Sequence, residues 1–65
     1  MAIQAYDKAL SINPKSNATW VNKGIALYKK GNYEEAIKLY DTALEIDPKL
    51  AITWYNKGIA LLALN

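Results

Sequence analysis

The octet WVNKGIAL at Trp20–Leu27 recurs with one change as WYNKGIAL at Trp54–Leu61, 34 positions later. When residues 1–31 are paired with residues 35–65, 17 of the 31 pairs are identical, far more than chance would give. Self-similarity at a fixed period of about 20 to 50 residues is typical of stacked arrays, in which each unit buries its apolar face on the next. The sequence therefore predicts a repeat protein with a 34-residue unit.

The octet indicates the first helix of the unit, which we call type A. Trp20, Gly24 and Leu27 stand at i, i+4 and i+7, so they share one side of a helix. Gly31 marks its end, because glycine adopts the left-handed conformation after a last helical turn at little cost. Cations suit the end of a helix, so Lys29 and Lys30 are interpreted as partners of the helix dipole.

A second helix, type B, is predicted from Tyr33 to the Asp47-Pro48 pair, where proline prevents continuation. Asn32 and Glu35 form an Asn-x-x-Glu pattern that predicts a capped start. The helical spacing of its apolar residues is carried by Tyr33, Ala36, Ile37, Tyr40, Ala43 and Leu44. Small residues on both helices predict close packing of A on B, with Trp20, Leu27 and Tyr40 filling the remaining volume.

The same pattern predicts a B helix over Ala2–Ile12 and an A helix over Leu50–Leu64, so the chain reads B, A, B, A. Short loops predict antiparallel neighbours. We therefore expect one all-α domain of four helices over residues 1–65. It divides into a B helix within 1–16, a complete repeat at 17–50 and an A helix within 51–65.

The W-x2-K-G-x2-L run from Trp20, the A-x3-Y run from Ala36 and Pro48 closely resemble the tetratricopeptide repeat pattern. The departures are Lys23 and Lys57 where the family prefers Leu, Leu27 and Leu61 where it prefers Tyr, and Tyr40 for Phe. The resemblance implies an α-solenoid, a right-handed superhelix that serves as a scaffold for protein–protein interaction. Lysine at the inner position can lay its methylenes along the seam and lift its ammonium to water.

The resemblance also implies a binding site, because stacked A helices line the concave face that receives a peptide in this family. The residues carried over to that face are Ala18, Val21, Asn22, Ile25, Tyr28, Ile52, Tyr55, Asn56, Ile59 and Leu62. The two asparagines can offer amide donors and acceptors to a peptide backbone. They can also be ordinary helix-surface residues.

Two related functions fit the residues less well. The family's clamp for acidic chaperone tails needs Lys or a second Asn where this chain has Ala18, Val21, Ile25 and Ile52. The pentatricopeptide repeat, an RNA reader of similar period, lacks the Trp and Gly signature and the Asp-Pro ending.

Catalysis is not expected, because the chain has no His, Cys or Arg. Glu34 and Glu35 are adjacent, but they suit the first turn of a helix. Asp41 and Glu45 are too few to enclose a calcium ion. Trp20 and Trp54 are interpreted as core residues and not as stacking platforms. We therefore expect no enzyme, cofactor or metal site.

Composition bounds the partners further. The net charge of +2 is spread along 65 residues and forms no basic block, so we expect no nucleic-acid partner. The apolar run Ile59–Leu64 is too short for a membrane span, and no secretory signal is expected. The chain has no Cys, so the redox compartment stays open, with a lean to the cytoplasm.

A second hypothesis is self-assembly, because the first B helix lacks its A and the last A helix lacks its B. Ala2, Tyr6 and Ala9 would then meet Gly58, Leu61 and Leu64 of another copy, head to tail. A symmetric dimer of C-terminal helices is the main alternative. The binding-module and self-assembly hypotheses are compatible with each other.

Overall fold

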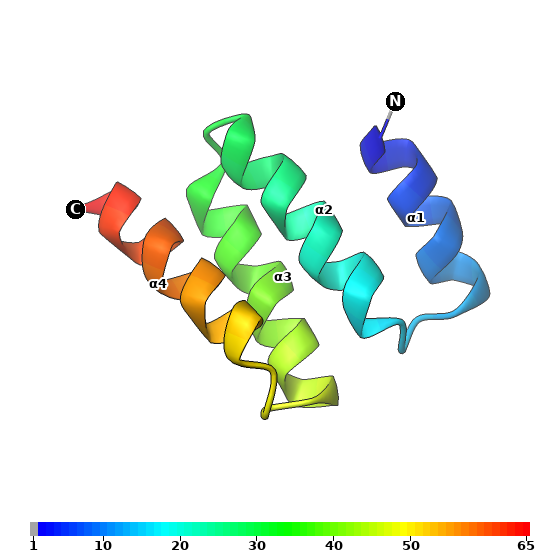
Figure 1. Cartoon of the computed structure of the whole chain (residues 1–65). Coiled ribbons are helices and arrows are strands. Elements are labelled where there is room, and N and C mark those ends of the chain that lie inside the picture. Colours follow the sequence, from blue (N-terminus) through cyan, green and yellow to red (C-terminus); the bar gives the residue numbers. More distant parts are fainter. Residues whose placement is uncertain (1) are drawn as a thin grey trace.

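The computed structural model describes residues 2–65 as four α-helices joined by short turns (Figure 1). The helices are α1 (Ala2–Ile12), α2 (Asn17–Lys29), α3 (Tyr33–Ile46) and α4 (Ala51–Leu64). Met1, which the repeat register pairs with Glu35, lies outside the described residues. The predicted all-α fold with four helices is confirmed.

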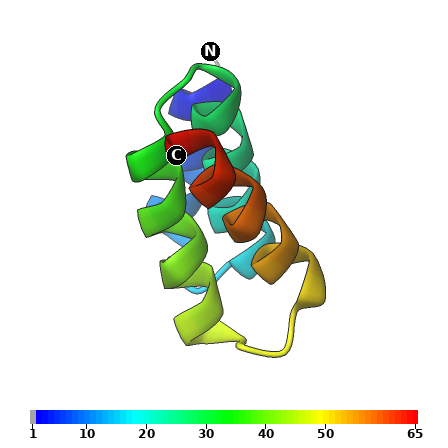
Figure 2. The same cartoon turned by 90° about the vertical axis from the view of Figure 1, so that its left-hand side faces the viewer.

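The helices pack in sequence, each antiparallel to the next, and α2 also contacts α4 (Figure 1). In the turned view, α4 lies in front of α2 on one side of the molecule and α3 lies on the other (Figure 2). Helix α3 therefore holds the two A helices, while α1 contacts α2 alone within residues 2–65. None of these helices is long and apolar enough to cross a membrane.

The turn between α2 and α3 is the glycine-dependent one that the sequence predicts. Gly31 has φ 89°, in the left-handed region that costs glycine little. Its N–H donates to the Tyr28 carbonyl at 3.0 Å, and the Asn32 N–H donates to the Leu27 carbonyl at 2.9 Å. This pair of bonds is a Schellman motif, which satisfies the last carbonyls of α2 and reverses the chain.

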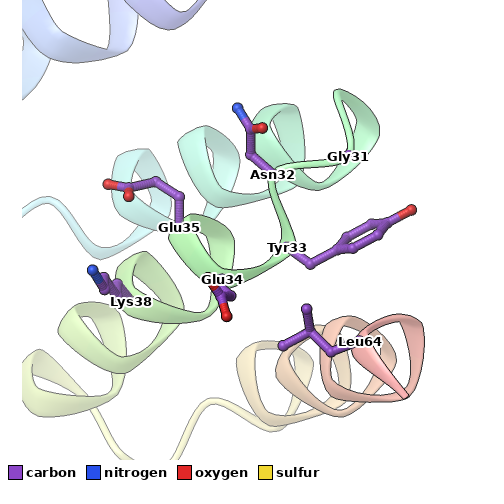
Figure 3. Close-up of a pocket in the computed structure, with 7 residues that line it drawn as sticks. All are labelled: Gly31, Asn32, Tyr33, Glu34, Glu35, Lys38 and Leu64. Atoms are coloured by element: carbon purple, nitrogen blue, oxygen red, sulfur yellow. The ribbon is translucent and has the colours of Figure 1, made fainter.

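The predicted side-chain cap at the start of α3 is wrong. Asn32 makes no side-chain capping bond, and its carbonyl instead accepts the Ala36 N–H at 3.0 Å. The side chains of Asn32 and Glu35 point in different directions (Figure 3). Both residues are exposed, so water competes for their hydrogen bonds and little is gained by pairing them.

The two turns that lead from a B helix to an A helix share one construction. Asn13 Oδ1 accepts the Lys15 N–H in the first turn, and Asp47 Oδ1 accepts the Lys49 N–H in the second. These bonds form when a short polar side chain folds back onto its own backbone. Each turn then presents its proline carbonyl toward the helix that follows.

That carbonyl is bound by the tryptophan of the next helix. Trp20 Nε1 donates to the Pro14 oxygen at 2.6 Å, and Trp54 Nε1 donates to the Pro48 oxygen at 2.8 Å. Trp20 is half-buried against the core, as predicted. The prediction of Trp54 as a core residue is wrong: it is 52% exposed, because no helix covers that side of α4 within residues 2–65.

The core is centred on α3, which has a helix on either side. Tyr40 is 1% exposed, and Ala36 and Ala43 are fully buried. The tyrosine ring lies directly over Gly24 of α2: a Cβ built on that glycine would stand 2.5 Å from Tyr40 Cε1. Gly24 is therefore required by the close approach of a ring, and it sets the spacing between α2 and α3.

Alanine at the two repeat-equivalent glycines should have opposite effects. Gly24→Ala forces its methyl group against a buried ring and should cost roughly 1 to 3 kcal/mol of unfolding free energy. At Gly58 nothing lies within 4 Å of a built Cβ, so Gly58→Ala should instead stabilise the helix by about 1 kcal/mol. Urea unfolding of the monomer measures both changes, and equal effects would contradict the assigned packing.

Burial also makes stability depend on pH through Tyr40. Desolvation, with a smaller contribution from nearby Tyr28, raises the pKa of Tyr40 above its ordinary 10.0. In the unfolded chain this tyrosine ionises at lower pH than in the folded chain, so the unfolding free energy should fall as pH rises above 10.0. Tyr40→Phe should fall less steeply in urea titrations at about pH 9 and about pH 11. Parallel curves would contradict the burial of the phenol.

Candidate protein-interaction groove

A shallow groove runs along the side of the molecule on which α2 and α4 lie together. It is lined by Asn17, Ala18, Val21, Asn22, Ile25, Asp47, Leu50 and Ile52. The first five come from α2, Ile52 comes from α4, and the remaining two come from the turn before α4. Because α3 packs on the opposite side of both A helices, the groove is open to solvent along its length.

The groove unites half of the residues expected on the concave face: Ala18, Val21, Asn22, Ile25 and Ile52. The other five lie outside its lining. Tyr55 and Leu62 are exposed on α4, and Ile59 and Asn56 are half-buried there. Tyr28 turns toward the next helix, where its ring centroid is 5.2 Å from that of Tyr33.

The two asparagines of the octets are not equivalent. Asn22 is exposed, so its amide is available at the groove. Asn56 is half-buried, and its Nδ2 is shielded from solvent without a hydrogen-bond partner among the described residues. Asn17 Oδ1, on a residue that lines the groove, is shielded and unpartnered in the same way. The amide that is open to a ligand is therefore that of Asn22.

The charged residues of the helix seams are engaged with each other. Lys23 Nζ lies 2.5 Å from Asp7 Oδ1, and Lys57 Nζ lies 2.7 Å from Asp41 Oδ1. Each pair joins an A helix to the B helix before it, so Asp41 has a structural partner. Within residues 2–65, no group of three or more metal-binding side chains is present.

The residues expected to self-associate lie on α1 and α4. Gly58, Leu61 and Leu64 are exposed on one side of α4, where Leu61 is 46% exposed against 7% for its equivalent Leu27. On α1, Ala2 is exposed while Tyr6 and Ala9 are half-buried.

A second depression lies between the turn before α3 and the end of α4 (Figure 3). Glu34, Glu35 and Lys38 line it together with Tyr33, Leu64 and the turn residues Gly31 and Asn32. The two glutamates are exposed in the first helical turn, where negative charge stabilises the helix N-terminus. Their position is explained by the helix itself.

Comparison with protein-family models gives two overlapping matches. A model described as TPR repeat matches residues 24–65, and a model described as tetratricopeptide repeat matches residues 5–38. The chain belongs to the tetratricopeptide repeat family. A search of curated proteins gave no match. Tetratricopeptide repeats are typically protein–protein interaction modules and are generally not catalytic.

The main departure from the tetratricopeptide repeat pattern is explained by the ion pairs. Lys23 and Lys57 stand where the family prefers leucine, and their side chains are 21% and 25% exposed. The expectation that their ammonium groups reach water is wrong, because these groups bind the aspartates of the preceding helix. Lys57 Nζ also lies 5.5 Å from the centroid of Trp54, within the range of a cation–π interaction.

Sequence reasoning missed a buried polar group beside the groove. Ser16 Oγ and Thr19 Oγ1 share a hydrogen bond of 2.8 Å at the start of α2. At the equivalent start of α4, Leu50 replaces the serine, and fully buried Thr53 is left without a hydrogen-bond partner among the described residues. The sequence does carry a signal for it: aligning the two repeats pairs Ser16 with Leu50, so the hydroxyl that binds Thr19 has no counterpart beside Thr53.

Valine at the two repeat-equivalent threonines should therefore change stability in opposite directions. Thr53→Val replaces an unpartnered buried hydroxyl with a methyl of similar size and should stabilise the fold by about 1 kcal/mol. Thr19→Val removes the bond to Ser16 and should destabilise it by about 1 kcal/mol. Thermal or urea unfolding of both variants measures the difference, and a loss of stability in Thr53→Val would contradict this assignment.

Proposed function

We propose that the chain binds an extended or helical peptide segment of a protein partner in the groove between α2 and α4, without catalysis. The observation that carries this proposal is the groove itself, which gathers side chains from both A helices on the side opposite α3. A rigid, concave surface built from successive helices suits recognition of a single segment.

The lining favours a segment with apolar side chains. Ala18, Val21, Ile25 and Ile52 form the apolar part, and Leu50 extends it at the turn. Beyond the lining, Tyr55 and Leu62 remain exposed on α4. Burying apolar area of this kind is the main source of affinity in such grooves.

The polar groups at the groove set orientation and charge preference. The Asn22 amide can donate to a peptide carbonyl and accept from a peptide N–H, which fixes the register of a bound backbone. Asp47 is the charged residue among those that line the groove. Its carboxylate favours a basic side chain in the ligand and disfavours an acidic tail, because like charges at an interface repel.

The test begins with selection of peptides from a displayed random library against the wild-type chain. Asn22→Ala should weaken a selected peptide about fivefold, the equivalent of one hydrogen bond. Ala18→Phe should block binding, because Ala18 is exposed and lines the groove. Binding is measured by fluorescence anisotropy, and circular dichroism checks that both variants remain helical.

Asn32→Ala provides the matched control, because Asn32 is exposed, lies in the turn before α3 and makes no capping bond. It should bind the selected peptides as the wild type does. Undiminished binding by both groove variants would show that the peptides use another surface.

A further inference from the structure

We propose that the open face of α4, formed by Trp54, Gly58 and Leu61, binds helix α1 of a second copy of this chain. The two helices would adopt the arrangement that α2 and α3 have within one copy. This surface is distinct from the groove between α2 and α4, so the proposal does not depend on the peptide-binding function.

The interface of α2 with α3 supplies the template. Gly24 receives the ring of Tyr40, which is 1% exposed, and Leu27 is buried beside the same helix. Ala36 and Ala43, one turn or nearly so on either side of the tyrosine, are fully buried. A B-helix face with a tyrosine between two alanines therefore fits an A-helix face with a glycine and a leucine.

Helix α4 carries the A side of this interface without its partner. Gly58 repeats Gly24, yet nothing within residues 2–65 lies within 4 Å of a Cβ built there. Leu61 repeats Leu27 and is about half exposed. Trp54 extends the same side of the helix and is also exposed. Leu64 is exposed too, but it lies toward the depression beside Tyr33. The vacant position above Gly58 thus has the shape that a tyrosine ring fills in the template.

Helix α1 carries the B side. Tyr6 repeats Tyr40, and Ala2 and Ala9 repeat Ala36 and Ala43 at the same spacing. None of the three is buried, whereas all three of their equivalents are. Helix α1 of a second copy therefore suits the open face of α4, with Tyr6 of one copy over Gly58 of the other.

The contacts of α1 leave this face available. Helix α3 contacts two helices, using Tyr40 toward α2 and Asp41 toward Lys57 of α4. Helix α1 makes only the second kind of contact, through Asp7 and Lys23. A second copy on the Tyr6 side would thus continue the packing already present between α2 and α3, and it would complete the burial of Tyr6 and Ala9, which are half-buried in one copy.

The contact is heterologous, because the two surfaces belong to different helices, so it can repeat from copy to copy. Helices α1 and α4 lie on opposite sides of the molecule, as such stacking requires (Figure 1). A symmetric dimer through α4 alone would also cover Leu61 and Leu64, but it would leave Tyr6 without a role.

Sedimentation equilibrium over a wide concentration range tests the contact. The wild type should show an average mass that rises with concentration. Gly58→Ala should weaken association about tenfold or more, because its methyl group would meet the incoming ring. The same variant is expected to gain monomer stability, so weaker association cannot be attributed to misfolding. A wild type that stays monomeric up to millimolar concentration, or association unchanged in Gly58→Ala, would overturn the proposal.

Mixing two blocked variants distinguishes the head-to-tail contact from the symmetric dimer. Tyr6→Lys blocks α1, and Leu61→Lys blocks the open face of α4. Each variant alone should be monomeric, and an equimolar mixture should give a 1:1 dimer and nothing larger. If Tyr6→Lys proves unfolded by circular dichroism, Ala2→Lys at an exposed position replaces it. Association of the α1-blocked variant at wild-type strength would overturn the proposal in favour of pairing through α4.

Discussion

The contact of the Tyr40 ring with Gly24 is the constraint on which the remaining architecture depends. It fixes the distance between α2 and α3, because no side chain separates the ring from the helix backbone. Burial of the alanines on either side of the ring follows from that close approach. With α3 seated on α2, its other side is available to α4, and an ion pair of 2.7 Å joins that second seam. One small residue thereby sets how closely α2 and α3 pack.

The same arrangement produces the groove. Since α3 contacts both A helices on one side, α2 and α4 lie next to each other and present their other side to solvent. The core therefore sets the shape of the groove and contributes Val21 to its lining, while polar residues outside the core supply its hydrogen-bonding groups. Asn22 illustrates this division, because it belongs to the repeated octet but has no packing role.

The sequence was sufficient to predict the helices, the left-handed Gly31 and the small-residue seam, because each follows from periodicity or from backbone sterics that the repeat displays twice. It was not sufficient for features that depend on what covers a residue. Trp20 and Trp54 occupy equivalent positions in the repeat, yet their burial differs. A following helix, α3, packs against the Trp20 side of α2, whereas no helix among residues 2–65 covers Trp54. The cap at Asn32 failed for a related reason, since a pattern of residue types does not reveal competition from water. In the candidate groove, repeat position predicted five of the eight lining residues, whereas the inward turn of Asn56 required the packed structure.

The chain makes one glycine–tyrosine contact internally, and the proposed assembly repeats that contact between two copies. An isotope-filtered nuclear Overhauser experiment on a concentrated mixture of labelled and unlabelled protein tests it directly. An intramolecular signal between Gly24 and the Tyr40 ring is expected at every concentration. An intermolecular signal between Gly58 and the Tyr6 ring is expected to grow with concentration. Absence of the first signal would contradict the fold, and absence of the second at concentrations where the mass has risen would contradict the repeated use of the contact.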